Sequence, residues 1–90
     1  MTTLCLHCYV TGRVQGVGFR YATAEKALAL DVKGYVRNLP DRRVEVLACG
    51  EKTAVLALHD WLWQGPQMAR VTHVSCETVP YQDFRDFQMD

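Results

Sequence analysis

The sequence predicts an α+β fold in which two helices cover one face of a mainly antiparallel sheet. Segments with strand-like alternation and helix-like spacing follow one another as strand, helix, strand, strand, helix, strand. A proline-containing turn between the middle two strands is short enough for a hairpin. With 90 residues the chain is too short for two independent cores. This order is that of a ferredoxin-like βαββαβ sandwich, which we predict as a single domain over residues 1–90.

Each element is predicted from its local pattern. In order, the segments are a strand at 4–10, a helix at 21–30, strands at 35–38 and 44–49, a helix at 53–64, a strand at 69–79 and a short edge strand at 84–89. Tyr21, Ala24 and Leu28 fall at i, i+3 and i+7, with Ala27 beside them, which predicts the core-facing side of the first helix. Val71 and Val74 cannot share a face under strict alternation, so we expect a β-bulge between them.

Composition narrows the class of function. Ten acidic and ten basic residues give a formal net charge of zero, whereas a nucleic-acid-binding domain is expected to carry a basic surplus. No apolar stretch approaches the length of a membrane span. Met1–Leu4 lacks the layout of a signal peptide. These features favour a cytoplasmic enzyme or binding module that contacts neither nucleic acid nor a membrane.

The four cysteines do not form a metal site. Cys5 and Cys8 have CxxC spacing, but on a strand they point to opposite faces, and no second CxxC exists. Cys8 and Cys76 are interpreted as buried or half-buried free thiols. In the strand order 4-1-3-2 that this fold commonly has, the start of the first strand meets the end of the third. A Cys5–Cys49 disulfide is therefore a hypothesis, opposed by the reducing cytosol.

A glycine-rich turn leads from the first strand into the first helix. Residues 12–20 read GRVQGVGFR, in which three glycines allow positive φ angles and close approach of a ligand. Backbone N–H groups in such a turn can form an anion-binding nest beside the positive end of the helix dipole. Arg20 adds a planar cation suited to phosphate. The turn lacks the closing Gly-Lys-Ser/Thr of a Walker loop and is not a dinucleotide fingerprint, so a purely connecting turn is the alternative interpretation.

The predicted topology brings a second polar residue to this turn. The second strand runs parallel to the first, with the third strand between them, so its last residue, Asn38, lies at the same end of the sheet as the loop. We therefore expect Arg20 and Asn38 to converge on one site. Taken on its own, Asn38 would be interpreted as a turn-forming asparagine at the end of a strand.

Two sequence blocks resemble the signature of the acylphosphatase family. They are GRVQGVGFR at 12–20, followed by Thr23, and GYVRNLPD at 34–41, followed by VEV at 44–46. The resemblance continues through Gly65-Pro66 and the stretch 69–71. The chain departs from the family where Arg42 stands in place of the common Asp-Gly, which strains the hairpin if that position is left-handed.

The resemblance implies a hydrolase that splits acyl phosphates into a carboxylate and inorganic phosphate. Arg20 would bind the phosphoryl oxygens and Asn38 would orient the attacking water, with Thr23 supporting Asn38. The implied clamp also includes backbone amides, those of Gln15, Gly16, Val17, Gly18 and Phe19. The resemblance implies a monomer that needs no metal and no cofactor and binds only small acyl phosphates and inorganic phosphate.

Two other classes of function fit parts of the same pattern. A noncatalytic phosphate-sensing module would keep Arg20 and would not need Asn38. An RNA-binding ferredoxin-like module is suggested faintly by residues 18–21. That module needs aromatic residues on both central strands, and the third strand, 44–49, has none.

Overall fold

The helices and strands of the protein occur in the predicted order. A computed structural model describes residues 2–90. Its elements are β1 (Thr3–Arg13), α1 (Phe19–Leu30), β2 (Lys33–Asn38), β3 (Val44–Glu51), α2 (Lys52–Leu62), β4 (Arg70–Val79) and β5 (Phe87–Met89). The ferredoxin-like α+β prediction is confirmed. Within residues 2–90 neither helix is long and apolar enough to cross a membrane.

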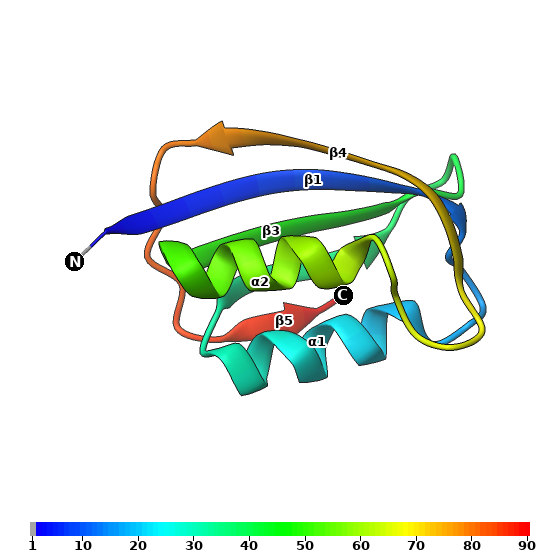
Figure 1. Ribbon diagram of the computed structural model, residues 1–90, viewed down its shortest axis with the longest axis horizontal. Helices are drawn as coiled ribbons and strands as arrows, with labels where there is room; N and C mark the ends of the chain where they lie inside the picture. Colours follow the sequence, from blue (N-terminus) through cyan, green and yellow to red (C-terminus); the bar gives the residue numbers. More distant parts are fainter. Residues whose placement is uncertain (1) are drawn as a thin grey trace.

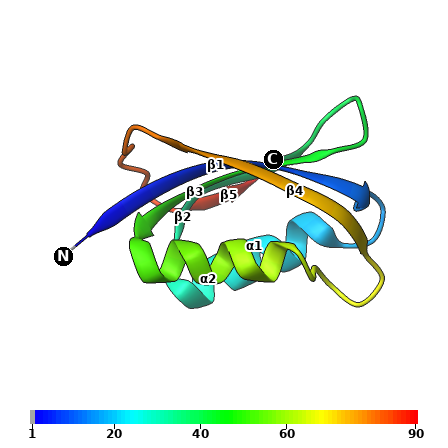
Figure 2. The same ribbon diagram turned by 45° about the horizontal axis from the view of Figure 1, so that its top comes forward.

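The five strands form one sheet in the order β4-β1-β3-β2-β5. All neighbours are antiparallel except β2 and β5, which are parallel. Both helices lie on one face of this sheet (Figures 1 and 2). Because β3 lies between β1 and β2 and is antiparallel to both, β1 and β2 run in the same direction. The last residue of β2 therefore lies at the end of the sheet where the chain leaves β1.

The main core fills the space between the helices and the sheet. Its buried members include Val10, Val36, Val46, Leu58 and Phe19. The opposite face of the sheet carries a smaller cluster of Cys5, Leu47 and Cys49, packed beneath Tyr35, Val79 and Phe84. The sheet is therefore partly covered on both faces, and the apolar side chains of β1 and β3 are used on both.

The expected bulge in β4 is present. The pairing of β1 with β4 shifts between Thr11 and Gly12, which leaves Thr72 without a Cα partner. The strands approach so closely here that a Cβ on Gly12 would lie 2.2 Å from the carbonyl oxygen of Arg70. In the β2–β3 turn Arg42 has a φ of 77°, the left-handed conformation in which a non-glycine residue is strained.

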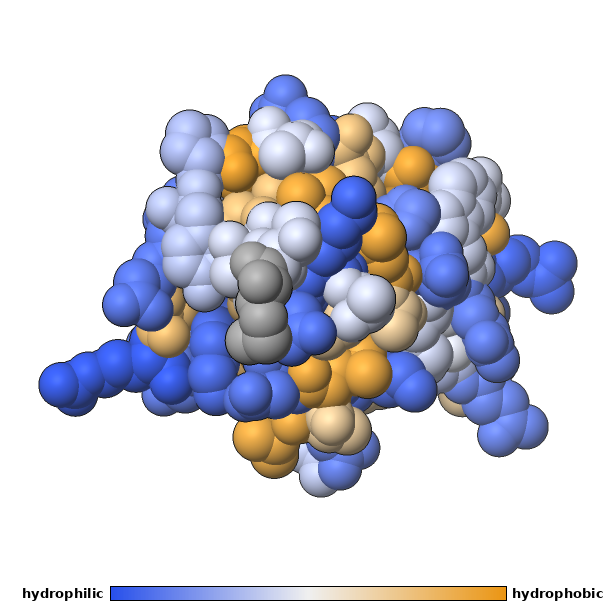
Figure 3. All heavy atoms as spheres, turned by 60° about the vertical axis from the view of Figure 1, so that its left-hand side comes forward, coloured by the Kyte–Doolittle hydropathy of each residue, from blue (hydrophilic) through white to orange (hydrophobic). Residues whose placement is uncertain are grey.

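The expected core-facing side of α1 is wrong. Tyr21 and Leu28 are 61% and 77% exposed; the helix buries Ala27, which was expected on this side, together with Phe19 and Thr23, which were not. The helix begins at Phe19, two residues before the predicted start, and Phe19 lies on its buried side. Figure 3 shows apolar side chains gathered at the lower edge of the molecule, over α1.

The interpretation of Cys8 and Cys76 as free thiols is also wrong. The two residues are direct Cα partners between β1 and β4, 4.0 Å apart, and a disulfide joins them. The sequence alone did not give the β1–β4 register, because no short turn joins these two strands. On the other face, Cys5 and Cys49 are direct partners between β1 and β3, and their sulfur atoms are bonded. Both disulfides thus link β1 to a neighbouring strand.

Candidate active site

The loop that joins β1 to α1 is shaped by two glycines. Gly16 and Gly18 have φ angles of 76° and 78°, and a Cβ placed on either would meet nothing within 4 Å. Open space therefore lies directly over this backbone. Gly18 is also the N-cap of α1, where the described residues supply no side-chain cap and no acid in the first turn. The amides at this helix terminus remain available to an anion.

Arg20 and Asn38 line the same cavity, as the topology predicts. Arg20 is the second residue of α1 and Asn38 is the last of β2. The cavity has a volume of about 180 Å³ and is lined by Val14, Gly16, Gly18, Phe19, Arg20, Tyr21, Asn38 and Met89. A guanidinium, an open glycine backbone and a neutral amide therefore face one space, a set of groups suited to a small oxyanion and a bound water.

The guanidinium of Arg20 already holds one oxygen atom. Its Nη1 donates a 2.6 Å hydrogen bond to the carbonyl oxygen of Asp90. The segment that brings this oxygen is fixed by β5, and the Asp90 amide in turn donates to the carbonyl of Val36. Because a guanidinium has five N–H donors, one such bond orients Arg20 and leaves donors for a ligand. Nothing in the sequence signalled that β5 would reach this site.

The side chain of Gln15 ties the glycine-rich loop to the hairpin that carries Asn38. Its Nε2 donates to the carbonyl oxygens of Leu39 at 2.9 Å and Arg43 at 3.0 Å. Leu39 directly follows Asn38, so these two bonds fix the distance between the loop and the asparagine. Sequence reasoning gave Gln15 only a backbone role and missed this one, because the hairpin register that points both carbonyls at the loop is a tertiary feature.

The other residues predicted for the site divide into two groups. Gly16, Gly18 and Phe19 line the cavity with Arg20, whereas Val17 packs against the core. Thr23 is fully buried, and its Oγ1 has no hydrogen-bond partner within residues 2–90. The structure thus brings Arg20, Asn38 and part of the loop together and leaves Thr23 one turn further along α1, outside the cavity lining.

A buried carboxylate lies behind the strand that carries Asn38. Glu45 on β3 is 4% exposed, accepts a 2.6 Å hydrogen bond from His7 Nε2, and pairs with Arg37 Nε. Burial opposes ionisation, but the hydrogen bonds from His7 and Arg37 outweigh it, so the pKa of Glu45 lies below its ordinary value. The hydrogen bond between Arg37 and Glu45 also raises the pKa of Arg37. This cluster holds β2 against β3 one residue before the site.

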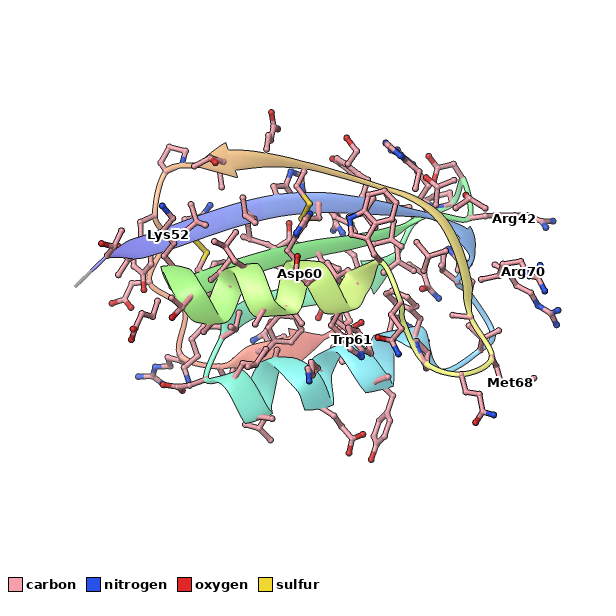
Figure 4. All side chains as sticks on the ribbon, viewed as in Figure 1. Arg42, Lys52, Asp60, Trp61, Met68 and Arg70 are labelled. Atoms are coloured by element: carbon pink, nitrogen blue, oxygen red, sulfur yellow. A yellow bond between two sulfur atoms is a disulfide. The ribbon has the colours of Figure 1, made fainter. Side chains whose placement is uncertain are left out.

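Basic side chains project around this end of the molecule. Arg42 from the hairpin and Arg70 from β4 extend outward at the same end (Figure 4). Gly12, Arg13, Val14, Gln15 and Arg42 line a second cavity of about 370 Å³ on the neighbouring side of the loop. Although the formal net charge of the chain is zero, the surroundings of the loop are therefore positive, which favours the approach of anions.

Fold and site together define a small ferredoxin-like domain with an anion pocket at the start of its first helix. Residues 6–89 match the Acylphosphatase family. An acylphosphatase of Chromohalobacter salexigens is 66% identical over 73 residues, which is 81% of each chain. One of Nitrosococcus oceani is 52% identical over 85 residues, covering 94% of this chain and 96% of that protein.

Solved structures agree with the sequence comparison. An acylphosphatase from Coxiella burnetii superimposes with a TM-score of 0.94 at 41% identity, over 98% of this chain and 93% of that one. One from Bacillus subtilis gives 0.93 at 33% identity, over 97% and 98%. The chain belongs to the acylphosphatase family of enzymes. Membership of this family supports a hydrolase that acts on small acyl phosphates.

Proposed function

We propose that this protein hydrolyses acyl phosphates by means of a phosphate clamp and a positioned water. Arg20 and the amides of the loop at 15–19 bind the phosphoryl oxygens, and the side-chain amide of Asn38 orients the water. The observation that carries this proposal is the single cavity shared by Arg20, Gly16, Gly18 and Asn38. Family membership supports the same reaction.

The reaction asks little of the protein beyond position and charge. An acyl phosphate has a carboxylate leaving group, so no strong general acid is needed to expel it. Water oxygen attacks phosphorus, the bond from phosphorus to the acyl oxygen breaks, and carboxylate and inorganic phosphate form. The proton of the water passes to a phosphoryl oxygen, because a neutral asparagine is too weak a base to accept it. Donors placed in advance around the phosphoryl group supply most of the rate enhancement.

The proposal assigns separate tasks to the two principal side chains. Arg20 binds phosphoryl oxygens in substrate, transition state and product, so its loss weakens all three. Asn38 contacts only the water, so its loss slows the chemical step alone. Thr23, fully buried one turn further along α1, is proposed to support Asn38 from outside the cavity lining. The reaction is proposed to need no metal ion, to be carried out by a monomer and to occur in the cytoplasm.

Replacing Arg20 tests the clamp directly. We expect Arg20→Gln to lose hydrolysis of benzoyl phosphate and competitive inhibition by inorganic phosphate together, each by a hundredfold or more, an effect on the order of removing an oxyanion donor. Arg85→Gln is the matched control, because Arg85 is exposed and lies outside the cavity. Unchanged phosphate inhibition in folded Arg20→Gln would contradict the clamp. Tight phosphate binding without turnover by the native chain would indicate a sensing module instead.

A further inference from the structure

A groove with mainly apolar walls runs between α1 and β5. It has a volume of about 270 Å³, and its apolar walls are Tyr21, Ala24, Leu28, Val32, Phe87 and Met89. The side of α1 that the sequence marked as core-facing forms one wall. The regularly spaced apolar residues on this side of α1 therefore line a groove and do not pack into the core.

Three large apolar side chains in this groove are left in water. Tyr21 is 61% exposed, Leu28 is 77% exposed and Met89 is 50% exposed. Single exposed apolar residues are ordinary on a protein surface, but a continuous apolar hollow is typical of a binding site. Figure 3 shows an apolar area at the lower edge of the molecule, over α1.

The groove adjoins the candidate active site. Tyr21 and Met89 line both the groove and the cavity that contains Arg20 and Asn38. A phosphoryl group held at Arg20 would therefore have its acyl part beside the mouth of the groove. We propose that this groove is the acyl subsite and that it selects acyl phosphates with an extended hydrocarbon chain. This inference rests on the proposed hydrolysis of acyl phosphates.

The charged residues of the groove indicate which acyl groups it accepts. Glu25 and Asp86 contribute carboxylates, while the ammonium of Lys33 pairs with Asp31 at 3.0 Å. An acyl chain that ends in a carboxylate would meet net negative charge and lose hydration without gaining a partner. The groove therefore favours uncharged aliphatic or aromatic acyl groups over dicarboxylic ones such as succinyl.

A series of acyl phosphates measures the subsite. For acetyl, butyryl, hexanoyl and octanoyl phosphate we expect kcat/KM to rise about twofold to fourfold per methylene, since full burial of one methylene corresponds to about fourfold and the groove encloses one side of the chain. Succinyl phosphate should react more slowly than butyryl phosphate. In Leu28→Gln the rise should flatten while acetyl phosphate is unaffected. Leu56→Gln, on the exposed side of α2, is the matched control and should keep the full slope.

The outcomes separate this inference from the proposed function. A flat series in the native protein, or the same slope in Leu28→Gln and wild type, overturns the acyl subsite while leaving hydrolysis intact. Absence of turnover with every substrate overturns the hydrolase instead. For that case n-alkylphosphonates of the same lengths are titrated calorimetrically, and their Kd should still fall about twofold to fourfold per methylene. A Kd independent of chain length would overturn the groove in either case.

Discussion

The hydrogen bonds of Gln15 give the sharpest prediction about how the site is held together. Gln15→Met keeps the length of the side chain and removes both donors. Each lost bond is worth about 0.5–1.5 kcal/mol. Both acceptor carbonyls keep another partner, because Arg42 N–H donates to Leu39 O at 3.1 Å and Leu39 N–H donates to Arg43 O at 2.9 Å. No carbonyl is left unpaired by the change, so the cost stays near the lower half of that range, about 1–2 kcal/mol in total.

Equilibrium unfolding and steady-state kinetics measure this effect together. For a domain of this size, 1–2 kcal/mol lowers the urea midpoint by about 1 M. The hairpin that carries Asn38 also loses its tether, so we expect kcat to fall about tenfold to a hundredfold through misplacement of the water. Gln64→Met, at an exposed glutamine beyond the end of α2, is the control. A variant of Gln15 with wild-type midpoint and wild-type kcat would refute the role of this side chain.

Three further predictions concern stability. Glu45 has a folded pKa below its unfolded value, so it stabilises the fold above about pH 4.5 and loses that contribution as the pH falls through the folded pKa. Glu45→Gln should therefore cost about 2 kcal/mol in urea unfolding at pH 7, and the cost should be smaller at pH 3, below the unfolded pKa. Gly34→Ala should unfold the protein, since its Cβ would lie 1.8 Å from the Leu47 carbonyl oxygen. Gly16→Ala, whose Cβ would meet nothing within 4 Å, should keep a folded circular dichroism spectrum but bind inorganic phosphate more weakly in a titration. Reducing the Cys5–Cys49 and Cys8–Cys76 disulfides, which join positions 44 and 68 residues apart, should lower stability by about 4 kcal/mol each, measured as a fall in Tm, and raise the intact mass by four hydrogens.

These predictions have clear contrary results. An equal cost of Glu45→Gln at both pH values would show that its charge does not stabilise the fold. A folded Gly34→Ala would contradict the close approach of β2 to β3. An intact mass that does not change on reduction would show that the cysteines are free thiols in the purified protein.

The sequence specified the fold because local pattern and topology agreed. Strand alternation, helix spacing and the proline turn predicted the βαββαβ order. The strand directions in that order placed Asn38 at the same end of the sheet as the glycine-rich loop. The resemblance of two separate blocks to one family indicated several residues that line the cavity, but not Val14, Tyr21 or Met89. Arg20, Gly16, Gly18 and Asn38 could therefore be predicted without coordinates.

The features that could not be predicted depend on register and on which side of an element faces inward. The register that pairs Cys8 with Cys76 joins two strands that no short turn connects, so no local signal fixes it, although the bulge in β4 was itself expected. Tyr21 and Leu28 do share one side of α1, as their spacing predicts. The buried side is nevertheless the one that carries Phe19, a residue that was interpreted as part of the loop. A periodicity argument cannot distinguish a side that packs on the sheet from one that lines a groove.

The same limit applies to contacts between distant segments. Gln15 meets Leu39 and Arg43, and Arg20 meets Asp90, across 24 to 70 positions of sequence. Such contacts follow from how the hairpin and β5 are placed after the sheet has formed. These contacts orient Arg20 and tie the glycine-rich loop to the hairpin that carries Asn38.

The most direct test of this account is the division of labour between Arg20 and Asn38. Benzoyl phosphate hydrolysis is measured with a chelator present for wild type and Asn38→Ala, and the Kd for inorganic phosphate is measured on the same samples. We predict rapid metal-free turnover by wild type, a loss of about a hundredfold to a thousandfold in the variant, and an unchanged Kd for phosphate. If Asn38→Ala turned over substrate at the wild-type rate, or lost phosphate binding together with turnover while still folded, Asn38 would not be the residue that positions the water.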